Sequence, residues 1–479
     1  MTVSPPQPKS LPGVESEAVR AALAEILAAA GEDLAVDGLT IAGDDPILPS
    51  RFRIGTAGAG TIGAVGVAVD AIWQARGGRR QRIGLDIAAI RAAYRSERHI
   101  LAIGGAPFRI WDPVSGFYRT ADNRYVQLHL NQPRLKAGAL ALLGAAETRD
   151  AVARAVATWP GQALEDAFAA AGLTAGLVRT PEEWRAHPQG QAAAAAPLVE
   201  IVKLGDAPAK PLAAAARPLT GIRVLDLTHL IAGPLCSRTL AEHGATVLRL
   251  SAPHLFNHNG MSADMGHGKA AAHLDLREPA GRARLLALVR EADIVVQGFR
   301  PGAMARYGIT PEAMAALNPG LIFTTLSAYG PSGPWRERPG FNSLVQSVSG
   351  IAYEGSRDAG IAEPKHLPAQ AIDFSAGYLG AFATLVALRR RAREGGSYLV
   401  RYSLARTGAW LQSLGRLPDP AALALAEPTT ADLAPYMTET ETGYGRLRHV
   451  TPVLGMSETP PHWSRPTAPF GTDPPAWPA

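Results

Sequence analysis

The second half of the chain alternates short apolar runs with longer segments in which apolar residues recur every three or four positions. The runs are rich in Val, Ile and Leu, and they predict strands at 222–227, 245–250, 272–276, 294–297 and 321–326. Helices are expected at 234–243, 278–291, 302–306 and 311–316. Strands that alternate with helices of this length indicate an α/β fold with a doubly wound parallel sheet.

The first half has a different pattern, in which helices predominate. Amphipathic or apolar helices are expected at 14–30, 60–74, 88–97, 132–144, 147–158 and 161–171. A short strand is predicted at 82–87, and residues 117–129 are typical of a β-hairpin with Asp122-Asn123 at its turn. The hairpin and the three helices after it predict a smaller α+β domain.

Changes in composition divide the chain into five parts. We place a first large segment at 1–110 and the small domain at 111–206. A linker rich in Pro and Ala follows at 207–218. The α/β domain takes 219–412, and the Pro-rich extension at 413–479 is expected to wrap over other elements rather than to fold alone.

An internal repeat links the two halves. An offset of 317 residues places Asp373 on Thr56, and it places Gly377 and Gly380 on two further glycines. Matching glycines count for more than matching alanines in this Ala-rich chain, because a closely packed helix constrains where glycine stands. The single lost carboxylate suggests one working site and one retired site.

Composition and charge narrow the classes of function. The 479 residues are 47% hydrophobic and 19% charged, with a net charge of +5, which suits small anionic ligands better than nucleic acid. Cys236 is the only cysteine, so we expect no intrachain disulfide and no cysteine-built metal site, and the histidines show no metal-ligand spacing. We expect no signal peptide at residues 1–8. The apolar runs at 56–69 and 376–388 fall short of a membrane span, so a cytoplasmic setting is expected.

Asp373 stands where a polar approach ends and a predicted apolar helix, 374–391, begins. In one interpretation its side chain only caps this helix, as Asp often does. In the other, the helix dipole holds the carboxylate ionised, and the carboxylate attacks an activated acyl group. The small residues Ala376, Gly377 and Gly380 would leave room for a ligand or for another backbone.

Two glycine-containing turns are candidates for phosphate contacts. Gly268-Lys269 precedes a strand, but alanines stand where a P-loop needs Gly and Ser or Thr, so nucleotide hydrolysis is excluded. This turn either cradles a phosphate or is a tight turn with a solvated lysine. Arg300 follows the strand 294–297, at the sheet edge where ligands of open α/β folds bind. It is a candidate phosphate or adenine contact, or part of an ordinary strand-to-helix turn.

A series of motifs follows one order through the second half. They are found at 219–228, 232–234, 244–247, 268–269, 274–276, 299–302, 327–334, 338–342 and around Asp373. With these motifs, residues 217–411 resemble the class III CoA-transferase family, which includes formyl-CoA and carnitine CoA-transferases and α-methylacyl-CoA racemase. In the first half, residues 52–95 are similar to the family's catalytic-aspartate region, and residues 116–191 to its small domain.

The resemblance implies a Rossmann-like CoA-binding domain and transfer of CoA between an acyl-CoA thioester and a small carboxylic acid. It identifies Asp373 with the family's catalytic aspartate, which forms a mixed anhydride and then an aspartyl-CoA thioester. Lys269 and Arg300 match positions near CoA phosphate and adenine contacts. The other residues expected at the CoA site are His229, Ala232, Gly268, Phe299 and Tyr329. CoA is then a substrate, and no permanently bound cofactor is expected.

The chain looks like two incomplete copies of the family that have been fused. The halves are expected to complement one another as an interlocked pseudo-dimer, with a homodimer as the other arrangement. Two further functions stay open, a CoA-ester isomerase or lyase and a non-catalytic CoA-ester-binding protein. Phe341 and Asn342 stand where the racemase branch has His and Asp, which disfavours racemisation. Ser251 replaces the usual acidic residue after the second strand.

Overall fold

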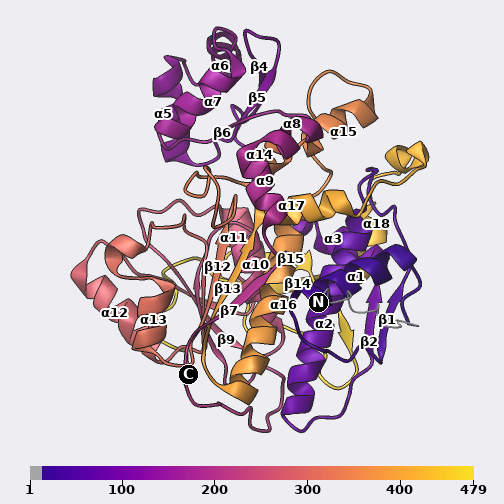
Figure 1. Cartoon of the computed structure of the whole chain (residues 1–479), viewed down its shortest axis with the longest axis vertical. Coiled ribbons are helices and arrows are strands. Elements are labelled where there is room, and N and C mark those ends of the chain that lie inside the picture. Colours follow the sequence, from indigo (N-terminus) through magenta and orange to yellow (C-terminus); the bar gives the residue numbers. More distant parts are fainter. Residues whose placement is uncertain (1–12, 479) are drawn as a thin grey trace, which may run out of the picture.

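A computed structural model describes residues 13–478, and the N-terminal segment expected to lack a signal peptide lies outside this range. The predicted α/β fold is confirmed by a seven-stranded sheet in the second half (Figure 1). Its strand order is β10-β9-β8-β11-β12-β13-β7. The bounds are β7 Glu200–Gly205, β8 Arg223–Leu227, β9 Thr246–Ser251, β10 Lys269–His273, β11 Ile294–Gln297, β12 Ile322–Ser327 and β13 Ser397–Ser403.

The sheet is parallel except at one edge, where β7 pairs antiparallel with β13. Neither strand was predicted from the sequence, and residues 200–205 belong to this sheet and not to the small domain, so the predicted boundary at residue 206 is corrected. Strand β10 starts three residues earlier than predicted, because its Lys269-Ala-Ala-Ala-His273 has weak strand propensity but pairs with β9 along its whole length. The remaining predicted strands of this half lie within one residue of their expected bounds.

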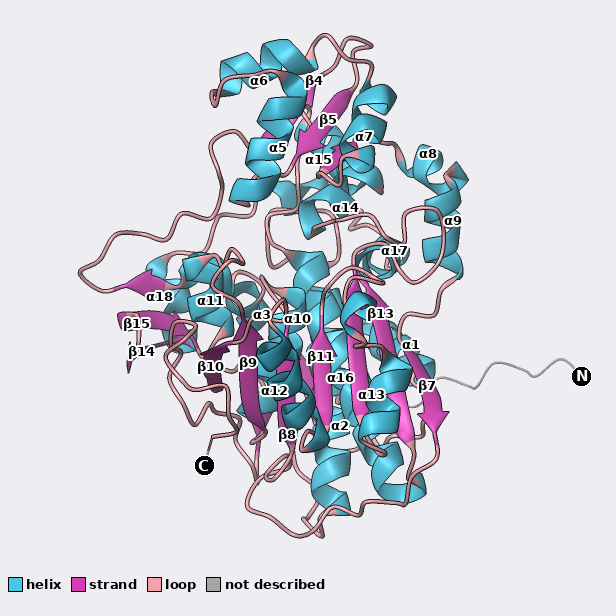
Figure 2. Cartoon of the chain, turned by 90° about the vertical axis from the view of Figure 1, so that its left-hand side faces the viewer, coloured by secondary structure: helices cyan, strands magenta, loops and turns pink. Residues whose placement is uncertain are grey.

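Helices cover both faces of the sheet. Figure 2 shows α12 and α13 over the near face, and α10 and α16 lie on the opposite face. Alternate strand residues supply the two cores, since Val224 packs with α10 and α16 while Leu225 packs with α12 and α13. The bounds are α10 Ala232–Glu242, α12 Pro279–Arg290, α13 Pro311–Leu317 and α16 Ala371–Glu394.

The long helix α2, Ile54–Ala75, packs along α16 and joins the two halves. The two helices begin at residues separated by the 317 positions of the sequence repeat. Both are longer than their predicted apolar runs, and by length and composition each passes as a membrane span. They are nevertheless 94% buried inside the protein, as core helices are. Their interface is therefore the centre of the molecule.

Two small sheets of the first half are completed by the C-terminal extension. In one sheet β16 pairs with β2, and in the other β15 pairs with β3. The extension therefore wraps over other elements, as the sequence predicted. The strands are β1 Leu39–Ala42, β2 Ile83–Asp86, β3 Leu101–Ala102, β14 Met437–Thr442, β15 Gly445–Val450 and β16 Gly455–Met456. The associated helices are α1 Glu17–Ala29, α3 Ile87–Ala93, α4 Ser96–His99 and α18 Thr430–Leu433.

The small domain contains the predicted hairpin, which is extended to a third strand (Figure 1). Its strands are β4 Gly116–Arg119, β5 Tyr125–Leu128 and β6 Ala175–Leu177, and its helices are α5 Pro133–Leu143, α6 Arg149–Val156 and α7 Gly161–Ala170. It is seated on α14, Asn342–Val348, which comes from the second half. The hydroxyl of Ser347 donates to the Gln127 Oε1 at 2.8 Å across this junction. Helices α8 Pro181–Ala186, α9 Pro188–Ala195, α11 Asn259–Met265, α15 Ile351–Ala359 and α17 Leu404–Ser413 complete the structure.

The linker 207–218 has no helix or strand, but it is fixed at its end. The Arg76 guanidinium, just after α2, donates to the carbonyls of Ala213, Pro218 and Thr220 at 2.5–2.8 Å. Because three backbone acceptors are used by one buried cation, the linker is held against the first half.

Candidate active site

Asp373 is the third residue of α16 and is half-buried. The helix begins at Ala371 rather than at residue 374, so Asp373 lies inside the first turn and is not the N-cap, which is Gln370. Helix α16 precedes β13 and α10 follows β8, so both helices have their N-termini at the carboxyl edge of the parallel strands. This is the edge at which ligands of such sheets bind.

A network of amides surrounds the carboxyl group. Asn342, at the start of α14, donates to the Gln370 Oε1, and its own Oδ1 accepts from the Gln346 Nε2 at 2.9 Å. Burial and the nearby Glu97 carboxylate raise the pKa of Asp373 to about 8, although the Asn342 amide lowers it. A carboxyl with such a pKa exchanges its proton near neutral pH, as acids and bases of active sites do.

Glu97 is the neighbouring carboxyl group, and it comes from α4 of the first half. Its side chain has no exposed area. Burial, opposed by Arg98 and assisted by Asp264, raises the pKa of Glu97 to about 7. No motif marked this residue in the sequence, because only the fold brings it to Asp373.

Aromatic packing fixes α4 beside the start of α16. The ring of Tyr94 stacks on Phe374, with 5.4 Å between centroids. The Tyr94 hydroxyl also lies 3.2 Å from the Ser375 hydroxyl. Since Phe374 and Ser375 follow Asp373 directly, these contacts hold the two carboxyl groups in one place.

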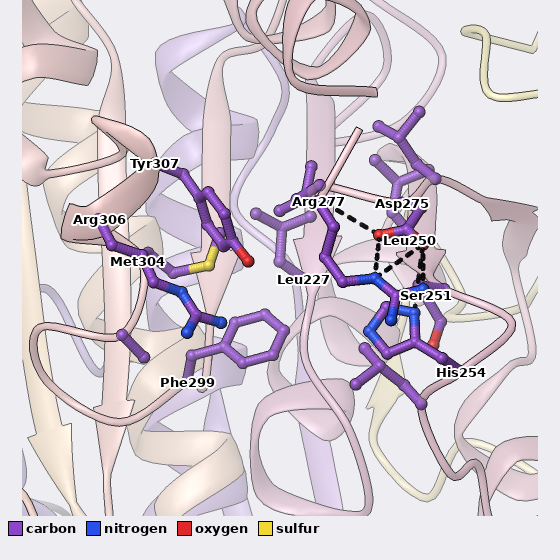
Figure 3. Close-up of a pocket in the computed structure, with 15 residues that line it drawn as sticks. Leu227, Leu250, Ser251, His254, Asp275, Arg277, Phe299, Met304, Arg306 and Tyr307 are labelled. Atoms are coloured by element: carbon purple, nitrogen blue, oxygen red, sulfur yellow. Dashed lines mark hydrogen bonds and ion pairs between the residues drawn. The ribbon is translucent and has the colours of Figure 1, made fainter. Parts of the chain in front are cut away.

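A pocket lies at the carboxyl ends of β8–β11, with a volume of about 600 Å³ that is partly open to solvent (Figure 3). Its apolar wall consists of Leu227, Leu250, Phe299, Met304 and Tyr307. Phe299 and Tyr307 make part of this wall aromatic.

Cationic side chains surround the apolar wall. Figure 3 shows Arg277 beside Asp275 and Arg306 beside Phe299. The Arg277 Nη2 lies 2.6 Å from the Asp275 Oδ2, so this cation is already paired. Arg300, the predicted phosphate or adenine contact, is exposed in the same turn as Phe299. Arg277 and Arg306 were not predicted from the sequence, because their positions depend on the fold of two loops.

His229 joins this pocket to the turn that enters α10. Its Nε2 lies 3.1 Å from the Ser251 hydroxyl, and its ring meets Phe299 edge-on at 5.5 Å. Burial lowers the pKa of His229 to about 4, so the imidazole is neutral at pH 7. Leu230 follows with φ of 70°, a backbone conformation that is strained for a leucine and is typical of functional turns.

The turn ends at Ala232, the first residue of α10. A Cβ added to Gly377 would lie 2.8 Å from the Ala232 carbonyl oxygen, so only glycine permits this approach of α10 to α16. Gly377 is one turn beyond Asp373. His229, Ala232, Phe299 and Asp373 are therefore brought together along one edge, with the pocket at one end and the carboxyl group at the other.

Comparison with known proteins agrees with this arrangement. Residues 219–418 match CoA-transferase family III. An acyl-CoA transferase from Gibberella moniliformis is 32% identical over 321 residues, which cover 61% of this chain and 56% of that relative. The second half of the chain is thus similar to CoA-transferase family III.

Further similar proteins match smaller parts of the chain. The succinyl-CoA–L-malate CoA-transferase alpha subunit of Chloroflexus aurantiacus is 35% identical over 198 residues, or 38% of this chain and 46% of that subunit. The crystal structure of Rv3272 from Mycobacterium tuberculosis has 32% identity and a TM-score of 0.37, and covers 42% of this chain and 58% of that one. The chain spans about half the length of the curated relatives it matches.

Lys269 lies in the segment that matches family III, but its surroundings do not support the phosphate contact predicted for it. Its ammonium group is buried and donates to the Asp226 Oδ2, the Ser237 hydroxyl and the Pro234 carbonyl at 2.7–2.8 Å. All three donors are used inside the protein, so none is left for a phosphate. Burial lowers the pKa of Lys269 to about 8 against the opposing effect of Asp226. The lysine is a cross-link between β8, β10 and α10.

Gly268 and Tyr329 also serve packing in the structure. A Cβ on Gly268 would lie 2.9 Å from Trp463 of the C-terminal extension, and the Gly268 amide donates to the Arg465 carbonyl at 2.9 Å. Tyr329 is buried with its ring edge-on to Trp335 at 5.2 Å. Neither residue is among those that line the pocket of Figure 3.

The equivalent position in the first half is occupied in a different way. The carboxylate of Asp45 accepts from the backbone amides of Gly55 and Thr56 and from the Thr56 hydroxyl, all at 2.7–2.8 Å. Thr56 is fully buried. The start of α2 is therefore capped by the carboxylate of Asp45, and Thr56 offers no carboxyl group where α16 has Asp373.

The side chains that commonly bind metal ions do not cluster in the part of the chain that the structure describes. Among residues 13–478, no three His, Cys, Asp or Glu side chains are arranged to hold a metal ion. The single thiol, Cys236, is buried, and burial raises its pKa to about 12.

Proposed function

We propose that the protein transfers CoA between an acyl-CoA thioester and a carboxylic acid, with Asp373 as the nucleophile. The observation that carries this proposal is the position of Asp373 in the first turn of α16, at the carboxyl edge of a family III domain. The names of similar proteins, such as acyl-CoA transferase, support the same chemistry.

The reaction proceeds in balanced acyl transfers. The Asp373 carboxylate attacks the thioester carbonyl, a C–O bond forms, and the C–S bond breaks to release the CoA thiolate. The thiolate then attacks the Asp373 carbonyl of the mixed anhydride and releases the donor acid as a carboxylate. The acceptor carboxylate reverses these two steps on the aspartyl-CoA thioester. Covalent catalysis thereby replaces one difficult exchange by easier ones.

The surroundings of Asp373 favour each step. The N-terminal dipole of α16 partly offsets the burial that disfavours the carboxylate, and it stabilises the oxyanions that form during transfer. The Asn342 amide donates to the Gln370 Oε1, and its hydrogen bond to the Asp373 carboxylate keeps that side chain oriented. The apolar neighbours Phe374 and Tyr94 exclude water, which would otherwise hydrolyse the anhydride.

The pocket of Figure 3 is the proposed site for the nucleotide part of CoA. Phe299 and Tyr307 offer flat apolar surface for adenine, and Arg306 and exposed Arg300 offer charge to the phosphates. CoA binds there as a substrate, and its pantetheine arm follows the His229–Ala232 turn toward Asp373.

Isotope exchange tests the proposal without knowledge of the natural partner acid. The protein is incubated with an acyl-CoA and the same acid labelled with carbon-14, and label in the acyl-CoA is counted. Borohydride added during turnover should reduce the aspartyl thioester and mark one residue for mass spectrometry. Exchange together with a mark on Asp373 is expected. A mark on another residue, or full exchange by Asp373→Ala, would remove the mechanism.

A further inference from the structure

A second cavity is lined in part by Glu97, the carboxyl group that neighbours Asp373. It has a volume of about 1390 Å³ that is partly open to solvent. Its walls come from the segment 97–110 of the first half and from α18 and the β14–β15 hairpin of the C-terminal extension. The CoA-transferase family III segment, 219–418, therefore contributes none of the residues that line it.

Glu97 connects this cavity to the catalytic carboxyl. It lines the cavity, and its charge is close enough to Asp373 to raise the pKa of that carboxyl. The stacked pair Tyr94 and Phe374 fixes this connection, as described above. Among the described residues, none gives a hydrogen bond to the buried Glu97 Oε2. The carboxyl group that connects the cavity to Asp373 therefore has one oxygen without a protein partner.

The wall of the cavity has a long apolar part. It includes Ile100, Leu101, Phe108, Leu433 and Met437. One of these residues, Leu101, is also among the large apolar side chains exposed on the described surface, at 38%. An apolar cavity wall that continues onto an exposed apolar side chain is typical of a binding groove for an apolar group.

The cavity also has charged residues in its wall. Arg98 lines the cavity beside Glu97, and its Nε is 3.4 Å from the Glu97 Oε1, which is a long contact. Arg448 also lines the cavity but is already paired with Glu439 at 3.2 Å. His99 is neutral at pH 7, because burial and the two adjacent arginines lower its pKa to about 4. Arg98 is thus the cation placed to hold a carboxylate next to Asp373.

We propose that this cavity binds the acid part of the substrates, and that it selects acids with a large apolar group. The apolar group lies along Ile100, Phe108 and Met437, and the carboxyl end reaches Arg98 and Asp373. The inference rests on the proposed CoA transfer and adds its substrate class. Both the donor acyl group and the acceptor acid use the cavity in turn, because each must place its carbonyl carbon or carboxylate at Asp373.

The test compares acids of different length in the isotope exchange. Decanoyl-CoA with labelled decanoate is compared with acetyl-CoA and labelled acetate. We expect kcat/KM for decanoyl exchange to be higher by at least about tenfold, since each methylene buried along the apolar wall adds favourable transfer free energy. Equal values for the two pairs, or a preference for acetyl-CoA, would overturn the proposal.

A matched pair of variants locates the selection in the cavity. Ala434→Trp places an indole in the cavity wall, and Ala431→Trp places the same group on exposed α18 outside the lining. Ala434→Trp should lower decanoyl exchange about tenfold and leave acetyl exchange unchanged. Ala431→Trp should leave both unchanged. An equal effect of Ala434→Trp on both pairs, or no effect, contradicts the assignment.

Direct binding separates failure of this inference from failure of the proposed function. Decanoate is titrated into the protein by calorimetry, without any reaction. If no acyl-CoA exchanges and Asp373 stays unmarked, the transfer is wrong, but decanoate binding that is lost in Ala434→Trp still supports the cavity. Absence of decanoate binding by the unmodified protein, with acetyl exchange intact, removes the cavity assignment and leaves the transfer in place.

Discussion

Thr56 and Asp373 occupy the same position, the third residue, of two helices that pack against each other. Around Thr56 the helix N-terminus is closed by the carboxylate of Asp45. Around Asp373 it is bordered by amides and a second carboxyl group. Equivalent helix ends have therefore been given opposite uses, one for stability and one for the proposed chemistry.

Substitutions at the two positions should separate these uses. Asp373→Asn keeps the shape of the side chain but removes the nucleophile, so isotope exchange should fall by a factor of about 10³ or more. Thr56→Val removes the hydroxyl that donates to Asp45 and should cost about 1–3 kcal/mol of unfolding free energy, with exchange per folded molecule unchanged. Urea titrations and exchange assays measure both. Loss of exchange in Thr56→Val without loss of stability would contradict a silent first site.

The pH dependence of exchange should report Asp373. Its carboxylate is the reactive form and its pKa is raised to about 8, so kcat/KM should rise with pH and level off above that value. Glu97→Gln removes the neighbouring charge and leaves Arg98 in place. The midpoint should then shift to lower pH, because ionised Glu97 disfavours a second negative charge. A midpoint that does not move would show that Glu97 has no electrostatic effect on the nucleophile.

Lys269→Met should act on stability and not on CoA binding. It leaves the Asp226 carboxylate buried without its cation, which costs about 3–5 kcal/mol. The double variant with Asp226→Asn should recover part of this loss, because no uncompensated charge remains. Urea unfolding and the KM for acyl-CoA distinguish the two roles. Unchanged stability with a raised KM would restore a phosphate contact for Lys269.

The junction of the small domain should weaken in acid. Burial lowers the pKa of His129 to about 3, and its ring stacks on Phe341 and bonds to the Ser343 hydroxyl. The unfolded chain takes up this proton near pH 6.5 and the folded chain does not. The free energy of unfolding should therefore fall below pH 6.5, by about 1.4 kcal/mol per pH unit for this group.

His129→Phe is the variant that isolates this effect. It keeps a ring against Phe341 but cannot titrate, so its unfolding free energy should fall less between pH 7 and pH 5 than that of the unmodified protein. His366, whose pKa burial lowers to about 4, should account for part of the remaining slope. Identical slopes in the two proteins would show that His129 is protonated in the folded state.

The sequence predicted the parallel sheet and Asp373 because both have local signals. Short Val- and Leu-rich runs mark the strands, and a carboxylate before an apolar helix marks the residue. The predicted bounds of β10 were three residues too late, because its three alanines give little strand signal. The role of Lys269 depends on that displacement, since as the first residue of β10 it points into the protein.

Other parts of the site have no local signal at all. Glu97 stands in a short polar helix, and nothing near it in the chain indicates that it meets Asp373. Arg306 and Arg277 resemble ordinary loop arginines until β10 and β11 place their loops around one pocket. Residues of this kind become visible only when contacts between distant segments are known.

The pairing of β16 with β2, and of β15 with β3, has a consequence for biosynthesis. Strands β2 and β3 remain without these partners until the distant C-terminal extension has been synthesised. Contacts between segments so far apart in the chain are slow to form. A chaperone that shields the unpaired edges of β2 and β3 during synthesis would then raise the yield of native protein more than one that acts after release.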